Sequence, residues 1–340
     1  MKQVSFEYAL ASLVARADEG VVLYGRRNAP TAEAIAEAYD STGKVVFSTA
    51  LGEGYAQRAQ RAKGGFVLTG ARTTNFKEGQ APAFVTKLDE AGKIVFATDV
   101  SFSFTPARGF GIGEANDGSF TFLGLAPTSV SSGWDIAVAK LSPAGTKGDE
   151  KIFGKDMFVE SIQDAIVDAD GNGYGLLAYG YEISGLRKVD SAGETVWNKS
   201  ATLLGRLAFD SAGNVVHVHQ SQLTKYSPAG DAEPEVAWSD DTDDVAYDVA
   251  AGPNGALAIA GQRNASTPIV VVRDAGGTNK IVPSLGATKS ASATGVAFDA
   301  KGKALFIAGS FEGTLTLDAA PGSITSNGTR AYYLARVALP

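Results

Sequence analysis

The sequence predicts an all-β fold assembled from repeated four-stranded segments. Its 340 residues include 40 glycines, 17 phenylalanines and 11 tyrosines, a composition typical of a turn-rich β protein. A glycine-bearing hairpin turn followed by an apolar strand recurs seven times along the chain. Small residues recur at a fixed distance before these turns. Together these observations predict a single seven-bladed β-propeller with four-stranded blades.

The recurring hairpin turn is the first marker of the repeat. Its copies lie at 17–25, 63–70, 116–124, 168–180, 210–218, 253–261 and 299–309. Glycine supplies the positive φ that such a turn needs, and a preceding Asp or Asn bonds to the nearby backbone. The marker therefore predicts the first two strands of each blade.

A strand, a turn and a second strand form the other marker. Copies lie at 37–47, 84–96, 137–145, 186–197, 223–231 and 270–282. Their turn glycines are 37 to 53 residues apart, and seven repeats of about 49 residues fill the chain. The predicted blades are 9–50, 51–100, 104–156, 157–201, 202–240, 241–287 and 288–340 plus 2–8.

The two ends of the chain predict how the ring closes. The third strand of the last copy, 332–337, stops three residues before the C-terminus, so no outer strand follows it. The opening residues Lys2–Phe6 resemble the outer strands Lys44–Phe47 and Lys93–Phe96. We expect the N-terminal strand to complete the last blade, which removes two exposed sheet edges.

A column of small residues is expected where the innermost strands crowd a central axis. Five positions before each hairpin glycine stand Ala15, Ala59, Gly113, Ile166, Ala208, Ala250 and Ala297. The second strands, such as 21–24 and 66–69, are apolar on both faces, as expected of a layer covered by neighbouring blades. Residues 31–38 have helical propensity, but their position predicts a loop leading into a third strand.

Charge and composition exclude several classes of function. A net charge of −7 argues against a nucleic-acid or anionic-membrane surface. The absence of cysteine excludes disulfides and thiolate chemistry. The sequence contains no run of about 18 apolar residues, so no transmembrane segment is predicted. Residues 1–20 loosely resemble a signal peptide, but Gln3, Ser5 and Glu7 interrupt the apolar region, so we expect them to be part of the fold.

Several segments of the sequence resemble known repeat families. Gly309–Val337, Ala83–Asp89 and Asp135–Leu141 resemble the secreted bacterial repeat propellers of the SBBP type. Asp190–Trp197 is similar to quinoprotein-like repeats. The resemblance implies a bacterial protein that is extracellular, periplasmic or attached to the cell surface. It implies no catalytic residue set, because these families are functionally diverse.

A second column, two residues before the small one, contains the candidate site. It consists of Leu13, Gln57, Gly111, Asp164, Arg206, Asp248 and Gly295. Asp164, Arg206 and Asp248 come from consecutive blades and should converge near the axis. With Gln57 and Arg58 they are the predicted ligand-binding residues. The same charges could instead pair to satisfy the channel rim, or Asp164 and Asp248 could perform acid–base catalysis.

Two further motifs have a metal-binding and a structural interpretation. Asp168, Asp170 and Asn172 have the oxygen spacing of a calcium loop, but Leu176 and Tyr179 stand where such loops carry acidic ligands, so a hydrogen-bonded turn is favoured. His217 and His219 share one strand face and could begin a metal site, but no third ligand is identifiable. We expect two hydrogen-bonded interior histidines and no resident cofactor, with calcium as the only candidate.

The loops differ in length on the face that carries the charged column. Long loops are predicted at 26–35, 72–82, 127–134 and 310–330, and short ones near Tyr181 and Gln220. This asymmetry would form a wall on one side, suited to a partner or a glycan. The acidic stretch 239–244 is expected to be a solvated loop between blades, or else to attract a basic partner.

The sequence thus favours a non-enzymatic, exported binding or scaffold propeller. It would recognise a protein partner or a surface glycan at its loop-bearing face, as a monomer or within a surface assembly. The alternative is a glycan-active hydrolase or lyase with its site at the mouth of the central channel, using Asp164 and Asp248.

Overall fold

The computed structural model describes residues 2–4, 9–29, 31–72, 81–102, 107–127, 134–153, 160–179, 183–201, 205–233, 236–239, 241–264, 266–282, 285–317, 323–326 and 330–339. Their contacts divide the chain into two compact units. Unit 1 comprises Met1–Leu23, Glu37–Phe47 and Leu204–Pro340. Unit 2 comprises Tyr24–Ala36 and Ser48–Leu203.

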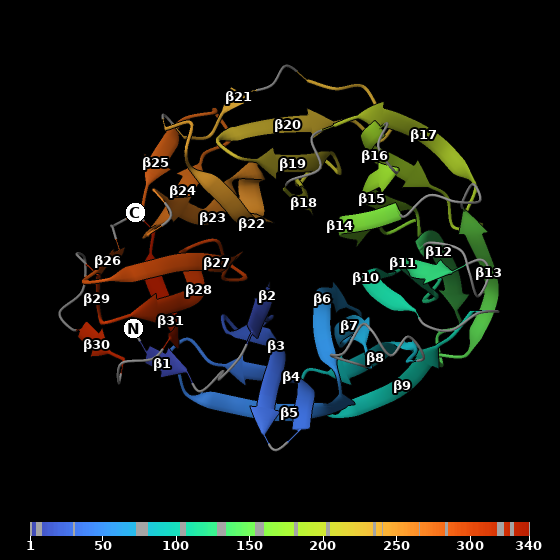
Figure 1. Ribbon diagram of the computed structural model, residues 1–340, viewed down its shortest axis with the longest axis horizontal. Helices are drawn as coiled ribbons and strands as arrows, with labels where there is room; N and C mark the ends of the chain where they lie inside the picture. The colour runs from blue at the N-terminus through green and yellow to red at the C-terminus, as the bar shows by residue number, and fades with distance from the viewer. Residues whose placement is uncertain are drawn as a thin grey trace. The chain divides into compact units, whose positions relative to one another are not determined.

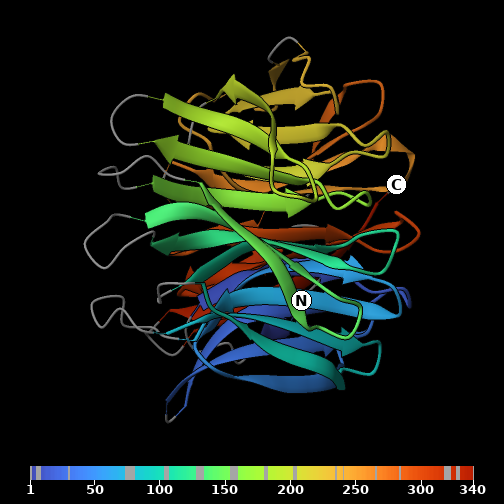
Figure 2. The same cartoon turned by 90° about the vertical axis from the view of Figure 1, so that its right-hand side faces the viewer.

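Unit 2 contains three complete four-stranded sheets, each with its strands in chain order. The first holds β6 (Tyr55–Ala62), β7 (Gly65–Ala71), β8 (Ala83–Asp89) and β9 (Ile94–Val100). The second holds β10 (Arg108–Glu114), β11 (Phe120–Pro127), β12 (Trp134–Leu141) and β13 (Lys147–Phe153). The third holds β14 (Glu160–Val167), β15 (Gly173–Tyr179), β16 (Ile183–Val189) and β17 (Thr195–Ser200). All pairings are antiparallel, and the arrows in Figure 2 alternate accordingly.

Unit 1 contains two further sheets of the same order. One holds β18 (Arg206–Phe209), β19 (Val215–His219), β20 (Gln222–Tyr226) and the very short β21 (Val236–Ala237). The other holds β22 (Val245–Ala251), β23 (Leu257–Arg263), β24 (Thr267–Arg273) and β25 (Asn279–Ile281), with a 3-10 turn η1 at Pro253–Gly255.

The N-terminal and C-terminal strands of unit 1 share one sheet. Its order is β1 (Lys2–Val4), β31 (Ala331–Ala338), β28 (Ala304–Glu312) and β27 (Ser290–Phe298). Gln3 lies opposite Tyr333 in the antiparallel β1–β31 pair, and the two strands are neighbours in Figure 1. The predicted pairing of the opening residues with the terminal segment is therefore present. Residues 5–8 of the predicted strand lie outside the described residues.

The first repeat forms a sheet of β2 (Ala9–Ala15), β3 (Val21–Ala29), β4 (Thr31–Tyr39) and β5 (Val45–Glu53). The prediction of a long loop at 26–35 is wrong, because β3 and β4 extend through most of this range. An ion pair between Arg27 and Glu33 at 2.6 Å lies on this extension. The helical propensity of 31–38 gives way to strand pairing, since tertiary contacts override local preference.

The described residues thus form seven four-stranded sheets and one three-stranded sheet. The small sheet consists of β26 (Leu285–Ala287), β29 (Thr314–Leu317) and β30 (Ser323–Thr325). It corrects the prediction of a structureless loop at 310–330, where the alternating sequence of Thr314–Leu317 forms a strand. Residues 73–80 and 128–133 of two other predicted loops lie outside the described residues.

Burial follows each strand's position in its sheet. Every residue of the second strands β7 and β11 is buried, as predicted from their apolar character on both faces. The fourth strands β9 and β17 alternate between exposed and half-buried residues, as expected of an edge with one packed face. The predicted order of inner and outer strands is thus visible in the burial pattern.

The hairpin turns have the predicted chemistry. At Asp89, the carboxylate Oδ1 accepts hydrogen bonds from the backbone amides of Ala91 and Lys93, at 2.9 and 2.8 Å. Gly92 closes the turn with φ of 82°, which favours glycine. The same pattern recurs at Asp190 and Asp210.

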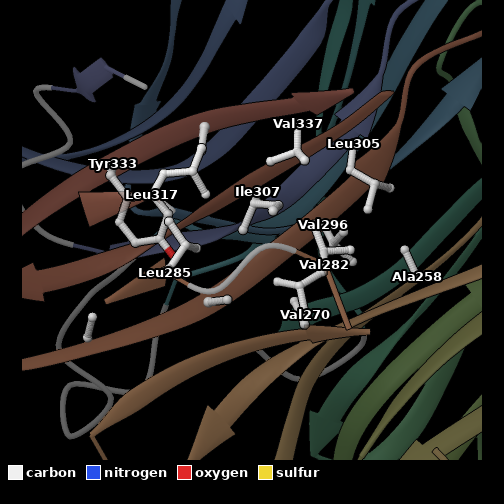
Figure 3. Close-up of a cluster of buried hydrophobic side chains, with 14 of the residues drawn as sticks. Ala258, Val270, Val282, Leu285, Val296, Leu305, Ile307, Leu317, Tyr333 and Val337 are labelled. Atoms are coloured by element: carbon white, nitrogen blue, oxygen red, sulfur yellow. The ribbon is translucent and has the colours of Figure 1, made fainter. Parts of the chain in front are cut away.

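Apolar side chains gather between neighbouring sheets. In unit 1, Ala258 and Val270 of one sheet pack in a cluster with Val296 and Ile307 of the next (Figure 3). In unit 2, a similar cluster contains Val67 and Val85 with Phe120 and Phe122. Within the described part of the chain, no helix has the length and apolarity to cross a bilayer.

Candidate functional site

A one-residue bulge recurs in the first strands of five sheets. The pairing register with the second strand shifts between Ala56 and Arg58, Gly109 and Gly111, Ile162 and Asp164, Ala246 and Asp248, and Ala293 and Gly295. Bulges re-aim side chains and are common beside functional sites. The residues directly after the bulge are Arg58, Gly111, Asp164, Asp248 and Gly295.

The bulges correct one position of the predicted column. Gln57 was aligned with Asp164 by counting back from the hairpin glycine, but Gln57 lies within the bulge and Arg58 takes the equivalent register. The cause is the turn after β6, where Ala62 pairs directly with Gly65. This turn is shorter than the others, so the count is off by one residue.

Arg58 forms an ion pair with Asp164 within unit 2. Its Nη1 lies 3.1 and 3.2 Å from the two carboxylate oxygens. The Asp164 side chain is only 6% exposed and that of Arg58 only 15% exposed. Asp164 Oδ1 also accepts a bond from the Ala165 amide at 3.0 Å. The pair is therefore largely removed from water and engaged internally.

The pair spans the intervening strand β10, which presents glycine to it. A Cβ atom added to Gly111 would lie 2.7 Å from the Ala165 Cβ. A Cβ at Gly113 would lie 2.7 Å from Val167, whose carbonyl accepts a bond from the Gln60 amide of β6 at 2.8 Å. Two β6 side chains thus reach β14 because β10 offers no side chain in their path.

Unit 1 contains an analogous arrangement around Asp248 on β22. Asp248 Oδ2 accepts hydrogen bonds from Ser12 Oγ of β2 and from the Val296 amide of β27, the latter at 2.9 Å. Both Asp248 and Ser12 are buried. Gly295 on β27 stands close to Ser12, since an added Cβ would lie 3.3 Å from the Ser12 Cα. A buried aspartate again reaches past a glycine to a partner two strands away.

Arg206 occupies the corresponding register on β18, opposite Val218. Its guanidinium Nη1 donates to the Gly205 carbonyl at 3.3 Å. The convergence of Arg206 with Asp164 and Asp248 stays a prediction, as does the assignment of these residues to ligand binding. The contacts of the two aspartates described above are made with other residues, Arg58 and Ser12.

Two titratable groups lie at the start of the same inner strands. Burial raises the pKa of Tyr55 on β6, and the charge of Arg108 opposes this shift. Burial lowers the pKa of Arg108 on β10. The Arg108 guanidinium also lies 4.3 Å from the centre of the Trp134 ring, a favourable cation–π distance.

The calcium candidate has the geometry of an ordinary hydrogen-bonded turn. Asp168 Oδ1 accepts bonds from the amides of Asp170 and Asn172 at 3.0 and 2.8 Å. Its Oδ2 accepts bonds from Asn172 Nδ2 and the Tyr174 hydroxyl at 2.9 and 3.0 Å. Asp210, outside any calcium-like triad, is bonded in the same way by its neighbours. The described residues contain no group of three or more Asp, Glu or His placed to hold a metal.

The two histidines lie inside β19, as predicted. His217 is 1% and His219 9% exposed, and every residue of the strand is buried. Their ring centroids are 4.9 Å apart, which confirms that they share one strand face. Gly205 approaches the His217 ring closely, since an added Cβ would lie 2.7 Å from Nε2.

A cavity of about 450 Å³ opens in unit 1 beside the acidic stretch 239–244. We call it the Arg263 cavity; its lining residues are Trp238, Ser239, Asp241, Thr242, Arg263, Ile269, Val271 and Asn279. The prediction of a solvated loop is wrong for part of this stretch, because Asp244 is fully buried. Thr242 and Asp243 are exposed as expected, and Asp240 lies outside the described residues.

Arg263 organises this acidic stretch. Its Nε and Nη2 donate to the two oxygens of Asp244 at 2.9 and 2.7 Å, a bidentate contact. Its Nη2 also donates to Ser239 Oγ at 3.2 Å, and Asp241 Oδ2 lies 3.7 Å from Nε. The buried carboxylate thus has a charge partner, and the guanidinium is held in a fixed plane.

The comparisons with known proteins identify the fold. No protein-family model and no curated protein sequence matches this chain. Among solved structures, virginiamycin B lyase from Staphylococcus aureus superposes with a TM-score of 0.63 at 10% identity, covering 98% of this chain and 97% of its own. The WD40 domain of Neurospora crassa Pan2 gives 0.59 at 8% identity, covering 96% and 90%. The chain has a β-propeller fold.

A third similar structure matches this chain over about half of its own length. Puromycin hydrolase superposes with a TM-score of 0.61 at 12% identity, covering 96% of this chain and 55% of its own. The three proteins are named as a lyase, a hydrolase and a WD40 domain. At these identities the likeness shows the propeller fold alone.

Sequence reasoning missed the Arg263 cavity of this propeller. Arg263 and Asp244 are 19 residues apart, and no local motif links them. One available signal was the predicted blade 202–240, which is the shortest of the seven predicted blades. Its fourth strand, β21, has two residues, against six in β17 and seven in β9.

Proposed function

We propose that this chain is a seven-bladed propeller, closed by its N-terminal strand, that works as a non-enzymatic binding or scaffold protein. The seven four-stranded sheets and the β1–β31 pairing support the blade count and the closure. Its partner is a protein or a surface glycan. The proposal includes export from a bacterial cell, which rests on the resemblance to secreted repeat propellers.

The internal bonding of Asp164 and Asp248 is the observation that favours a non-enzymatic function over catalysis by these residues. A general acid or base must reach the proton that it transfers. Asp164 is buried against Arg58, and Asp248 is buried against Ser12 and the Val296 amide. Both arrangements support the structural interpretation of these charges.

The alternative is a glycan-active hydrolase or lyase that uses the same two aspartates. One structural neighbour that is covered over nearly its whole length is named as a lyase, which supports keeping an enzymatic alternative. On this chain, each aspartate would first have to leave its internal bonds. We therefore place binding first.

Glycan-array and pull-down binding test the proposal. The wild-type chain is compared with a variant whose 72–82 segment is shortened, and we expect the variant to lose binding. Segment 310–330 is kept intact, because it contains β29 with the buried Leu315 and Leu317. Equal binding by both proteins would defeat the proposed loop-bearing surface. Turnover on a polysaccharide panel, abolished by Asp164→Asn or Asp248→Asn with folding intact, would establish the enzymatic alternative instead.

A further inference from the structure

The Arg263 cavity exists because one repeat is short. The fourth strand of the preceding sheet, β21, ends at Ala237, and the chain then turns away through Ser239 and Asp241. Ile269 and Val271 of β24, in the following sheet, line the cavity beside this short strand. Asn279 of β25 bridges the gap by donating its amide to the Ala237 carbonyl at 3.2 Å.

The size of the cavity suits a small molecule. Its volume of about 450 Å³ lies within the range of about 300–1,000 Å³ typical of small-ligand sites. A folded partner could insert no more than a single side chain. The occupant is therefore a compact group, or one residue of a longer polymer that continues into solvent.

The charges of the cavity select against an anion. One guanidinium, that of Arg263, faces the two carboxylates of Asp241 and Asp244. The bidentate bond to the fully buried Asp244 already compensates the positive charge. Asp241 is 35% exposed and adds a second negative charge at the surface. A phosphate, sulfate or uronate would meet net negative charge here.

The polar groups suit a ligand with hydroxyl groups. Asp241 Oδ1 already accepts a bond from the Asp243 amide at 3.0 Å, whereas Oδ2, which lies 3.7 Å from Arg263 Nε, can accept a bond from a ligand hydroxyl. The exposed Thr242 hydroxyl can donate or accept. Trp238 and Ile269 form the packed floor of the cavity, since they are only 1% and 6% exposed. The Trp238 indole is fixed, because its Nε1 donates to the Gln220 carbonyl at 2.7 Å. A fixed floor with a few polar groups beside it is characteristic of a preformed ligand site.

We infer that the Arg263 cavity binds one neutral sugar residue of a glycan. Asp241 accepts a bond from one of its hydroxyls, and Thr242 gives a further polar contact. This inference rests on the proposed binding function and specifies its ligand class and its site.

Calorimetric titration of the full chain with methyl glycosides of glucose, galactose and mannose tests the inference. We expect at least one to bind, Asp241→Ala to weaken that binding at least tenfold, and Thr242→Ala to weaken it by a smaller factor. Asp243→Asn is the matched control, because Asp243 is exposed, lies two residues from Asp241 and does not line the cavity. The control should bind within twofold of wild type. Unchanged thermal midpoints establish that each variant is folded.

Three outcomes would overturn the inference: no methyl glycoside binds, Asp241→Ala and Asp243→Asn bind equally, or glucuronate or a lysine amide binds more tightly than every neutral glycoside. The proposed function is tested separately by the loop-shortened variant. A chain that captures a partner through that loop but binds no glycoside retains the proposed function and refutes this site.

Discussion

Arg58 Nη1 lies 3.1 Å from Asp164 Oδ1, although the two residues are 106 positions apart and belong to different sheets. The strand between them, β10, places Gly111 in the same register and leaves their path open. Ser12 and Asp248 repeat the arrangement beside Gly295. A charged or polar residue, a glycine and an aspartate on three successive inner strands therefore form one recurring structural device.

Arg58→Met should destabilise the fold by about 3 kcal/mol, because it leaves the buried Asp164 carboxylate without its charge partner. Urea unfolding measures the change. Adding Asp164→Asn should restore part of the loss, since the uncompensated charge is then removed. Glu90→Gln is the control: its ion pair with Arg61 is more than one-third exposed on both sides and should change stability by less than about 1 kcal/mol. Equal losses in Arg58→Met and the control would contradict this account of the pair.

Gly111→Ala should destabilise unit 2 by about 1–3 kcal/mol, because the new methyl group would lie 2.7 Å from the Ala165 Cβ and 3.0 Å from its backbone. Gly148→Ala is the matched substitution on β13, where the nearest atom would be 3.5 Å away. It should leave stability unchanged or slightly raised. Thermal unfolding compares the two variants. A Gly111→Ala protein as stable as Gly148→Ala would show that the strands separate easily.

Asp210 should make stability depend on acid pH. Burial acts to raise its pKa, but hydrogen bonds from Asn214 and Ala212 and the contact with Lys225 outweigh burial and hold the pKa below the ordinary value. The stabilisation is therefore complete above the unfolded pKa of about 3.9 and is lost as the pH falls through the lower folded value.

Unfolding by urea at several pH values measures this contribution. The stability difference between wild type and Asp210→Asn should shrink as the pH falls from about 5 to about 2. Lys225→Met removes the Lys225 Nζ contact with Asp210 at 3.2 Å, so the pKa of Asp210 in the folded protein should lie closer to its unfolded value. The pH range over which the stability difference shrinks should therefore be narrower. A difference that stays constant over this range would exclude the proposed role of the ionised carboxylate.

Calcium should leave the thermal midpoint unchanged. The Asp168 carboxylate already accepts four internal hydrogen bonds, and a cation would have to displace several of them. Differential scanning calorimetry with millimolar calcium and with a chelator measures the effect. Asp210→Asn and Asp168→Asn should also lose similar amounts of stability, since the two turns share their geometry. A midpoint raised by calcium in wild type and not in Asp168→Asn would assign the ion to this turn.

The strands, turns and burial pattern could be predicted because their causes are local. A turn such as Asp89–Gly92 needs only a short acceptor side chain and a residue that tolerates positive φ. The predicted register of Gln57 was wrong because pairing between β6 and β7 sets the length of the turn that follows β6. This pairing cannot be read from the sequence.

The partners of the charged residues could not be predicted for a different reason. The ion pair of Asp164 with Arg58 was not foreseen, and Asp244 was expected in solvent but is paired with Arg263. Both pairings depend on side chains that reach across elements far apart in the sequence. Composition and spacing record which charges exist, whereas the backbone geometry decides which of them meet.

The two-residue strand β21 makes its sheet differ from the other sheets of the repeat. If all repeats were identical, the contacts between neighbouring sheets would be the same throughout. A ligand would then have no preferred position among them. A shorter outer strand uncovers side chains of the neighbouring sheet, whose positions are already fixed by the rest of the fold. Engineers could therefore open a second recess by shortening β9 or β17, whose outward residues contribute little to the packed interior.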